Sequence, residues 1–169
     1  MILSLHAGET VDTDYHHALF DNVQAVARFL APLRDQGKTV VTTNGCFDLI
    51  HLGHIQYLTE AARLGDILVV GINSDASVRK LKGPSRPLQS EHDRAAIMAS
   101  LRMVDAAFVF GEDDPRGFLE ILRPTVHVKG GDYTRDIIEK PVVEAYGGRV
   151  EIVSLIPNHS TTGIIARMG

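Results

Sequence analysis

The sequence lacks several features that define whole classes of protein. Its 169 residues include one cysteine, Cys46, which excludes an internal disulfide and fits a reducing compartment. No apolar run approaches the roughly 20 residues that span a bilayer, and the N-terminus has no basic segment typical of a signal peptide. The sequence therefore predicts a cytoplasmic protein without a membrane partner.

An excess of positive charge is also absent. The chain has 17 Lys and Arg against 21 Asp and Glu, a net charge of −4, whereas nucleic-acid-binding surfaces are normally basic. No nucleic-acid partner is expected. Four cations nevertheless fall within eight residues, at Arg79, Lys80, Lys82 and Arg86. This cluster is either a solvated loop or the wall of a cleft that binds small anions.

The remaining composition is that of one globular domain, with 44% hydrophobic and 22% charged residues. Five short apolar and β-branched runs are predicted to be strands: 39–43, 67–72, 106–110, 126–130 and 149–155. They do not alternate with polar residues, which is typical of strands covered on both faces. Helical segments are predicted between and after them: 54–64, 90–102, 115–122, a short one from Pro141, and a last one from Thr161. The predicted fold class is α/β, a doubly wound, Rossmann-like parallel five-stranded sheet with helices on both faces.

An additional helix is predicted before the first strand, over residues 14–35. Leu19, Val23, Val26 and Leu30 form an apolar stripe along it. The predicted organisation is an N-terminal helical extension, 1–37, followed by the main domain, 38–169. The stripe offers a surface for a second copy of the chain, so a homo-oligomer, a dimer or larger, is expected.

The stretch NGCFDLIHLGH, residues 44–54, joins the first predicted strand to the next helix. Ligands of doubly wound folds bind beyond the carboxyl ends of strands, so this junction is a candidate site. The G-x-G-x-x-G spacing of dinucleotide-binding folds is absent, which disfavours a nicotinamide site.

Two histidines, His51 and His54, lie three residues apart and so on one side of the first helical turn. One interpretation is that His51 caps the helix and His54 packs. The favoured interpretation is that both rings and the free N–H groups of the helix face an anion, which Gly53 allows to approach. With one cysteine and no H-E-x-x-H sequence, a protein-bound metal site is not predicted.

These residues resemble the nucleotidyltransferases related to cytidylyltransferases. His51 to His54 match the H-x-G-H signature of that family, and Gly45 to Asp48 match its G-x-F-D turn. Further blocks follow in the family's order: Asn73-Ser74-Asp75, the basic loop RKLKGPSRP, residues 101–105 with Arg102, and His159-Ser160-Thr161-Thr162. The resemblance covers about residues 38–168. Within the family, NGCFDLIHLGH with LKGPSRP and VKGGDYT is most similar to heptose 1-phosphate adenylyltransferases.

The resemblance implies transfer of AMP from ATP to heptose 1-phosphate, giving ADP-heptose and pyrophosphate for bacterial lipopolysaccharide or other surface glycans. The implied partners are ATP and a sugar phosphate, with Mg²⁺ held mainly through phosphates and water. The chain is too short to include a sugar kinase, so the free-standing form of the enzyme is expected. The alternatives are a cytidylyltransferase using glycerol 3-phosphate or another alcohol phosphate, a non-catalytic nucleotide-binding module, and a scaffold protein.

The expected roles fall into three groups, argued from residue types and from the resemblance. The catalytic group is His51, His54, Lys82, Arg102 and Thr161, with Arg102 expected to reach a phosphate from the end of its helix. The nucleotide-binding group is Asn44, Gly45, Cys46, Phe47, Gly53, His54, Lys129, Gly130, Gly131, Asp132, Tyr133, Ser160, Thr161 and Thr162. The sugar-phosphate-binding group is Asp48, Asn73, Arg79, Lys82 and Arg86.

Overall fold

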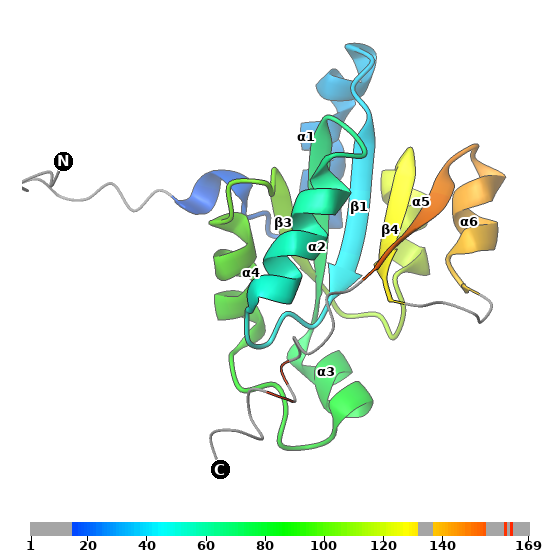
Figure 1. Ribbon diagram of the computed structural model, residues 1–169. Coiled ribbons are helices and arrows are strands. Elements are labelled where there is room, and N and C mark those ends of the chain that lie inside the picture. The colour runs from blue at the N-terminus through cyan, green and yellow to red at the C-terminus, as the bar shows by residue number, and fades with distance from the viewer. Residues whose placement is uncertain (1–14, 132–136, 155–160, 162, 164–169) are drawn as a thin grey trace, which may run out of the picture.

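A computed structural model describes residues 15–131, 137–154, 161 and 163 of the chain (Figure 1). Five parallel strands form one sheet in the order β3-β2-β1-β4-β5. The strands are β1 (Val40–Gly45), β2 (Ile67–Asn73), β3 (Ala106–Phe110), β4 (Val126–Gly130) and β5 (Arg149–Val153). All five predicted strands are confirmed, with ends that differ by a residue or two.

The direction of winding reverses at the centre of the sheet. From β1 the chain moves outward to β2 and β3, then returns to the other side of β1 for β4 and β5. The carboxyl ends of all strands meet at one edge, as the arrowheads in Figure 1 show. The gap beyond β1 and β4 at that edge is the topological switch point, where doubly wound folds bind ligands.

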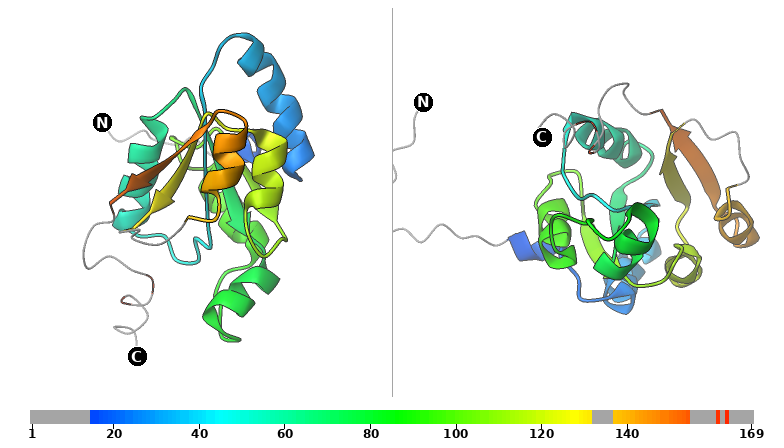
Figure 2. Two further views of the ribbon diagram at one scale, coloured as in Figure 1. Left: turned by 90° about the vertical axis from the view of Figure 1, so that its right-hand side faces the viewer. Right: turned by 90° about the horizontal axis from the view of Figure 1, so that it is seen from below.

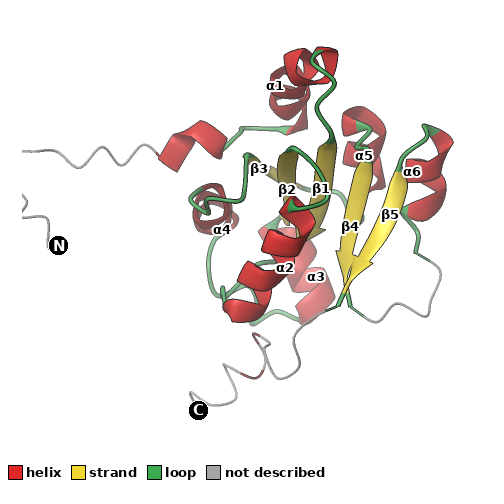
Figure 3. Ribbon diagram, turned by 45° about the horizontal axis from the view of Figure 1, so that its top comes forward, coloured by secondary structure: helices red, strands yellow, loops and turns green. Residues whose placement is uncertain are grey.

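Helices cover both faces of the sheet, as predicted (Figures 2 and 3). One face carries α2 (Leu52–Ala62) and α4 (Glu91–Ala99). The other carries α1 (Val23–Asp35), α5 (Arg116–Leu122) and α6 (Lys140–Ala145). Neighbouring strand residues therefore bury their side chains in different layers: Val41 packs in the α2 layer and Val40 in the α5 layer. This two-sided burial is why the strands are apolar without alternation.

Helix α3 (Asp75–Lys82) was not predicted. The Ser74 hydroxyl caps it by accepting a hydrogen bond from the Ser77 N–H at 3.2 Å. Six of its eight residues are exposed or partly exposed, and the basic ones obscure its apolar residues in the sequence. Helix α3 lies beyond the carboxyl edge of the sheet (Figure 1) and carries part of the predicted basic loop.

The single helix predicted over 14–35 is wrong. A 3₁₀ turn over Tyr15–Ala18 is followed by an extended residue, Leu19, which bridges to Ala107, and α1 begins only at Val23. The break has a local cause, because the Asn22 side chain caps α1 by accepting the Ala25 N–H at 2.9 Å.

Helix α1 is part of the core. Val26 and Leu30, two residues of the predicted apolar stripe, are fully buried against β3 and α5 of the same chain. The expectation of a homo-oligomer stays a prediction. Within the described residues, none of the helices has both the length and the apolar character needed to cross a bilayer.

Candidate active site

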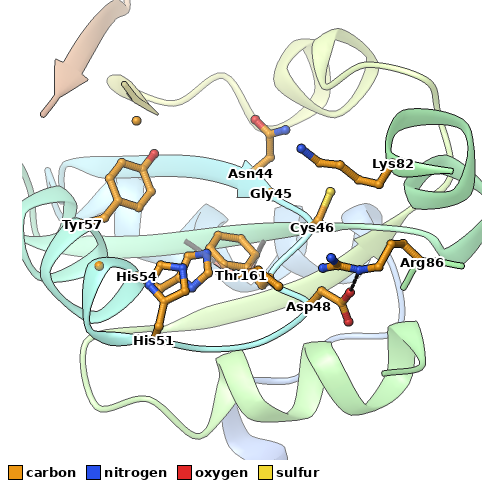
Figure 4. Close-up of a pocket in the computed structure, with 13 residues that line it drawn as sticks. Asn44, Gly45, Cys46, Asp48, His51, His54, Tyr57, Lys82, Arg86 and Thr161 are labelled. Carbon is orange, nitrogen blue, oxygen red and sulfur yellow. Dashed lines mark hydrogen bonds and ion pairs between the residues drawn. The ribbon is translucent and has the colours of Figure 1, made fainter. Parts of the chain in front are cut away.

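A pocket of about 380 Å³ opens at the carboxyl edge of the sheet, beyond the end of β1 (Figure 4). Its lining residues are Asn44, Gly45, Cys46, Phe47, Asp48, His51, Gly53, His54, Tyr57, Lys82, Arg86, Gly130 and Thr161. The structure therefore brings together the first predicted motif, two cations of the basic loop, the end of β4 and one hydroxyl residue of the last motif.

The two histidines form a stacked pair. Their ring centroids are 3.9 Å apart, with an angle of 28° between the ring planes. His51 is the N-cap residue of α2 by its extended backbone, but its side chain makes no capping hydrogen bond. His51 thus occupies the predicted cap position without a capping hydrogen bond from its side chain, and its ring stacks on His54.

Helix α2 directs its N-terminus into the pocket. His54 N–H already bonds the His51 carbonyl at 2.9 Å, while the preceding N–H groups, of Leu52 and Gly53, lie at helix positions that have no carbonyl of their own helix to bond. Together with the partial positive charge of the helix end, they favour an anion such as phosphate. Gly53 is buried and lines the pocket, so a ligand meets bare backbone there.

His54 is neutral at ordinary pH in this setting. Burial, and to a lesser extent the neighbouring His51, lower the pKa of His54 to about 4. Its Nδ1 atom is buried and has no hydrogen-bond partner among the described residues. A bound phosphate would supply both a partner for the ring and a negative charge that favours protonation.

The turn before α2 is strained at Phe47. This residue has φ 46°, a left-handed conformation that costs an L-residue on the order of 1–2 kcal/mol. The turn places the Phe47 ring beside Gly45, where an added Cβ would lie 3.0 Å from Cε2, and edge-on to His54 at 5.4 Å between centroids. The turn thus packs the Phe47 ring against the ring of His54.

Asp48 anchors the basic loop. Its carboxylate, 2% exposed, accepts hydrogen bonds from Arg86 Nε at 2.5 Å, Leu88 N–H at 2.8 Å and Gln89 N–H at 3.1 Å. The Gln89 side chain donates in turn to the Asp48 carbonyl at 2.7 Å. Residues 86–89 are therefore fixed to the G-x-F-D turn, and a sugar-binding role for Asp48 stays a prediction.

A second anchor, Arg94, was missed. Arg94 lies on α4, is fully buried, and donates to the carbonyls of Cys46 at 2.5 Å, Asn73 at 2.8 Å and Gln89 at 3.1 Å. It also pairs with Asp75 at 2.8 Å. One guanidinium thus joins the ends of β1 and β2 to the loop before α4. The signal in the sequence is a charged residue at a position where the helix is otherwise apolar.

The predicted site residues Arg102, Arg79 and Asn73 do not line the pocket. Arg102 is exposed and follows the end of α4, which runs antiparallel to the strands, so Arg102 lies at the amino edge of the sheet. Arg79 is exposed on α3. Asn73 is buried and donates to Ser77 Oγ at 3.0 Å, and neither it nor Arg79 lines the pocket.

The end of β4 contributes backbone to the pocket. Gly130 lines it, and Gly131 follows with φ 128°. Lys129, predicted to bind nucleotide, instead forms a largely buried ion pair with Glu139 at 2.7 Å. Four further predicted residues, Asp132, Tyr133, Ser160 and Thr162, lie outside the described residues.

The remaining lining residues are held by hydrogen bonds or burial. Thr161 donates to the Leu49 carbonyl at 3.2 Å. Tyr57, which was not predicted, donates to the Val128 carbonyl at 2.9 Å and contacts Thr43 Oγ1 at 2.5 Å. Its spacing of three residues from His54 was the available signal. Burial raises the pKa of the Cys46 thiol, which argues against a role as nucleophile.

The described residues contain no group of three or more His, Cys, Asp or Glu side chains that could hold a metal ion. The cations of the pocket are Lys82 and Arg86, and its other donors are imidazoles, backbone N–H groups, the Asn44 amide and the hydroxyls of Tyr57 and Thr161. Such a site is suited to polyphosphates, and the parallel fold with its switch point is that of a nucleotide-binding enzyme.

Comparison with known proteins gives the family. The model of the cytidylyltransferase-like family matches residues 42–167, about three quarters of the chain. The chain belongs to the cytidylyltransferase-like family of nucleotidyltransferases. The resemblance of its motifs to that family is thereby confirmed.

Comparison with curated proteins shows which members of the family this chain resembles. The chain is 53% identical over 161 residues to the bifunctional protein HldE of Syntrophotalea carbinolica, covering 90% of this chain and 32% of the relative. It is 52% identical over 148 residues to the bifunctional protein HldE of Geobacter sulfurreducens, covering 87% of this chain and 30% of the relative. The chain thus spans about a third of the length of these relatives.

Solved structures agree with the fold. A lipopolysaccharide core biosynthesis protein from Thermoplasma volcanium is 33% identical with a TM-score of 0.61, over 71% of this chain and 98% of that one. A pantoate-beta-alanine ligase from Francisella tularensis, complexed with beta-gamma ATP and beta-alanine, has a TM-score of 0.56 over 89% of this chain and 76% of its own. At 15% identity, the second shows the likeness of fold alone.

Proposed function

We propose that this protein transfers AMP from ATP to heptose 1-phosphate, giving ADP-heptose and pyrophosphate for bacterial lipopolysaccharide or another surface glycan. The observation that carries the transfer chemistry is the stacked pair His51 and His54 at the N-terminus of α2. The sugar rests on the resemblance of the motifs to heptose 1-phosphate adenylyltransferases, and on about 50% identity to the HldE proteins.

In the proposed reaction, an oxygen of the acceptor phosphate attacks the α-phosphorus of ATP. A new phosphorus–oxygen bond forms as the bond between the α-phosphorus and the bridging oxygen to the β-phosphate breaks, and pyrophosphate leaves. No proton has to be moved and no covalent enzyme intermediate is needed. Catalysis is then a matter of positioning the two phosphates and stabilising the charge that develops on the transferring group.

The histidine pair and the helix N-terminus stabilise that charge. Imidazole N–H groups and the N–H groups of Leu52 and Gly53 would donate to the α-phosphoryl oxygens. His54 is neutral before a ligand binds, so no charged ring has to be kept away from water in the pocket. The neutral ring can still offer a hydrogen bond to the anion.

Lys82 and Arg86 would reduce the repulsion between the two anionic substrates. Both line the pocket, Lys82 from the end of α3 and Arg86 from the loop anchored on Asp48. The ion pair with Asp48 takes up part of the charge of Arg86, which leaves Lys82 the more available cation. Thr161 would contact the terminal phosphates from the opposite wall.

Mg²⁺ would enter with ATP. Asp48 is the carboxylate among the lining residues, and it is engaged by Arg86 and two N–H groups, so the pocket favours an ion held by phosphate oxygens and water. The ion would neutralise part of the charge on the departing pyrophosphate. Free-standing activity, homo-oligomer formation and a cytoplasmic location also belong to this proposal.

The test is pyrophosphate release with each nucleoside triphosphate and Mg²⁺, against a panel of sugar 1-phosphates and alcohol phosphates. Release with ATP and heptose 1-phosphate is the expected result. Release with CTP and glycerol 3-phosphate would keep the reaction class and replace both substrates. Tight ATP binding without release for any acceptor would favour the non-catalytic module.

A further inference from the structure

The end of β1 divides the pocket into two halves. Figure 4 shows His51, His54 and Thr161 on one side of this strand end, and the Asn44 amide with the Lys82 ammonium on the other. Side chains alternate along a strand, and Thr43 contacts Tyr57 of α2, so Asn44 faces away from α2 and the histidines.

The Asn44 amide is poorly satisfied by the protein. Its Oδ1 atom is buried and has no hydrogen-bond partner among the described residues. A buried polar atom left in this state destabilises the protein, unless a ligand or water bonds to it. Asn44 lines the pocket, so a ligand can contact its side chain, and a rotation of the amide would bring Oδ1 to that ligand.

The strands beside β1 leave this amide to a ligand. On β2 the register partner of Asn44 is Gly71, which has no side chain and is covered by Phe110 and Phe118. On β4, Lys129 follows the register partner of Thr43, and its ammonium is held by Glu139 at 2.7 Å. Neither neighbour provides the partner that Oδ1 lacks.

We propose that Asn44 determines acceptor specificity by hydrogen-bonding a hydroxyl group of the sugar phosphate, while Lys82 binds its phosphate. This inference rests on the proposed function and moves Asn44 from the nucleotide-binding group to the acceptor half. An amide that both donates and accepts suits a polyhydroxy ligand. ATP then occupies the histidine half, and the two phosphates meet beside Gly45 at the end of β1.

The test separates the two substrates. In Asn44→Ala, the KM for the sugar 1-phosphate is expected to rise about 10- to 100-fold, because one buried hydrogen bond to the substrate is lost. The Kd for ATP with Mg²⁺, measured by calorimetry without acceptor, is expected to stay within about threefold of the wild type. Asn44→Asp keeps the shape of the side chain, and it should raise the acceptor KM further through repulsion of the sugar phosphate.

Thr161→Ala is the matched comparison from the histidine half. It should weaken ATP binding and leave the acceptor KM nearly unchanged. The assignment of Asn44 is overturned if Asn44→Ala weakens ATP binding while the acceptor KM stays constant. Failure of the proposed function gives a different result, because the wild type would then turn over another pair of substrates. In that case the same variants test the two halves of the pocket with that pair.

Discussion

At the scale of single residues, the most consequential feature is the chemical state of His54. It is a neutral, half-buried imidazole stacked on His51 and aimed at the same space as the N-terminus of α2. Nothing in the fold depends on a hydrogen bond from its Nδ1 atom, which has no partner among the described residues. We therefore expect His54 to contribute to kcat and to contribute little to the stability of the fold.

Replacement of His54 by alanine should reduce kcat for pyrophosphate release by about 100- to 1000-fold, the usual effect of removing a donor to a charge that develops in the transition state. The thermal unfolding midpoint should change by only a few degrees. His92→Ala, an exposed histidine on α4, is the control and should keep wild-type turnover. Near-normal kcat in His54→Ala would contradict the proposed role.

Replacement of Arg94 by lysine should destabilise the protein by about 2–4 kcal/mol, because one ammonium cannot reach the four acceptors that the guanidinium joins. Urea unfolding measures this change. Arg28→Lys, at an exposed position on α1, should lie within about 0.5 kcal/mol of the wild type. A stability loss as small as that of Arg28→Lys would show that the network around Arg94 is dispensable.

Sequence patterns identified the residues that line the pocket better than those that hold them in place. His51, His54, Lys82, Arg86 and Thr161 all line the pocket, because motif residues at strand ends converge there in any doubly wound fold. Arg94 was missed, and Arg102, which lies eight residues further along the chain, was predicted in its place. The reason is that spacing along a helix does not tell which end of the helix faces the carboxyl edge of the sheet.

At the scale of elements, the N-terminal segment shows what periodicity leaves open. The predicted apolar stripe is present on α1. The sequence, however, does not indicate whether this stripe packs on the same chain or on another chain. The structure buries Val26 and Leu30 against β3 and α5. Helix α3 was missed for the opposite reason, because a short helix that lies mostly in solvent has too few apolar residues to give a pattern.

Leu30→Ala should destabilise the protein by about 2–5 kcal/mol, the usual result of emptying a fully buried leucine site. Chemical unfolding is the measurement, and Ile121→Ala is the control, since that side chain is 43% exposed on α5. If Leu30→Ala cost no more than Ile121→Ala, α1 would be an appendage and not part of the core.

Asp48→Ala should release the loop that carries Arg86. The N–H groups of Leu88 and Gln89 both bond the Asp48 carboxylate, so hydrogen exchange in a peptide over 86–90 should become at least about tenfold faster. Peptides from β2 serve as the internal control and should exchange as before. Unchanged protection at Leu88 and Gln89 would mean that other contacts hold the loop.

At the scale of the whole molecule, two histidines with lowered pKa values, His54 and His127, determine how stability responds to mild acid. Burial lowers the pKa of His54 to about 4 and that of His127 to about 3, against an ordinary value of 6.5. The unfolded chain therefore takes up protons below about pH 6.5 that the folded chain does not. The stability these groups contribute is complete above pH 6.5 and is lost progressively as the pH falls toward 4.

The free energy of unfolding should accordingly decrease between pH 7 and pH 4.5, by up to about 1.4 kcal/mol per pH unit for each of the two histidines. Urea unfolding at several pH values measures the slope. Asp66 and Asp114, whose pKa values lie below the ordinary 3.8, lose their contribution only in stronger acid. His54→Asn should flatten the slope, and an identical slope in that variant would refute the assignment.

The fold as a whole was the easiest part to predict. Five apolar strands alternating with helices admit few arrangements once crossovers are right-handed and short. The pocket was harder, since it depends on three anchors that act across the chain: Asp48 on the loop of Arg86, Arg94 on three segments, and Phe47 on His54. Asp48 and Arg94 join segments that are distant in the sequence, and Phe47 has a strained backbone. Neither a distant contact nor a strained conformation can be predicted from a local sequence pattern.

The central place of β1 also has a consequence for synthesis on the ribosome. Strand β1 pairs with β2 on one side and with β4 on the other, and 80 residues, 46–125, separate β1 from β4. At translation rates of about 5–20 residues per second, one edge of β1 waits roughly 4–16 s for its second neighbour. During that interval the nascent chain has half a sheet and half a pocket, with an open strand edge that a chaperone or a neighbouring nascent chain can bind.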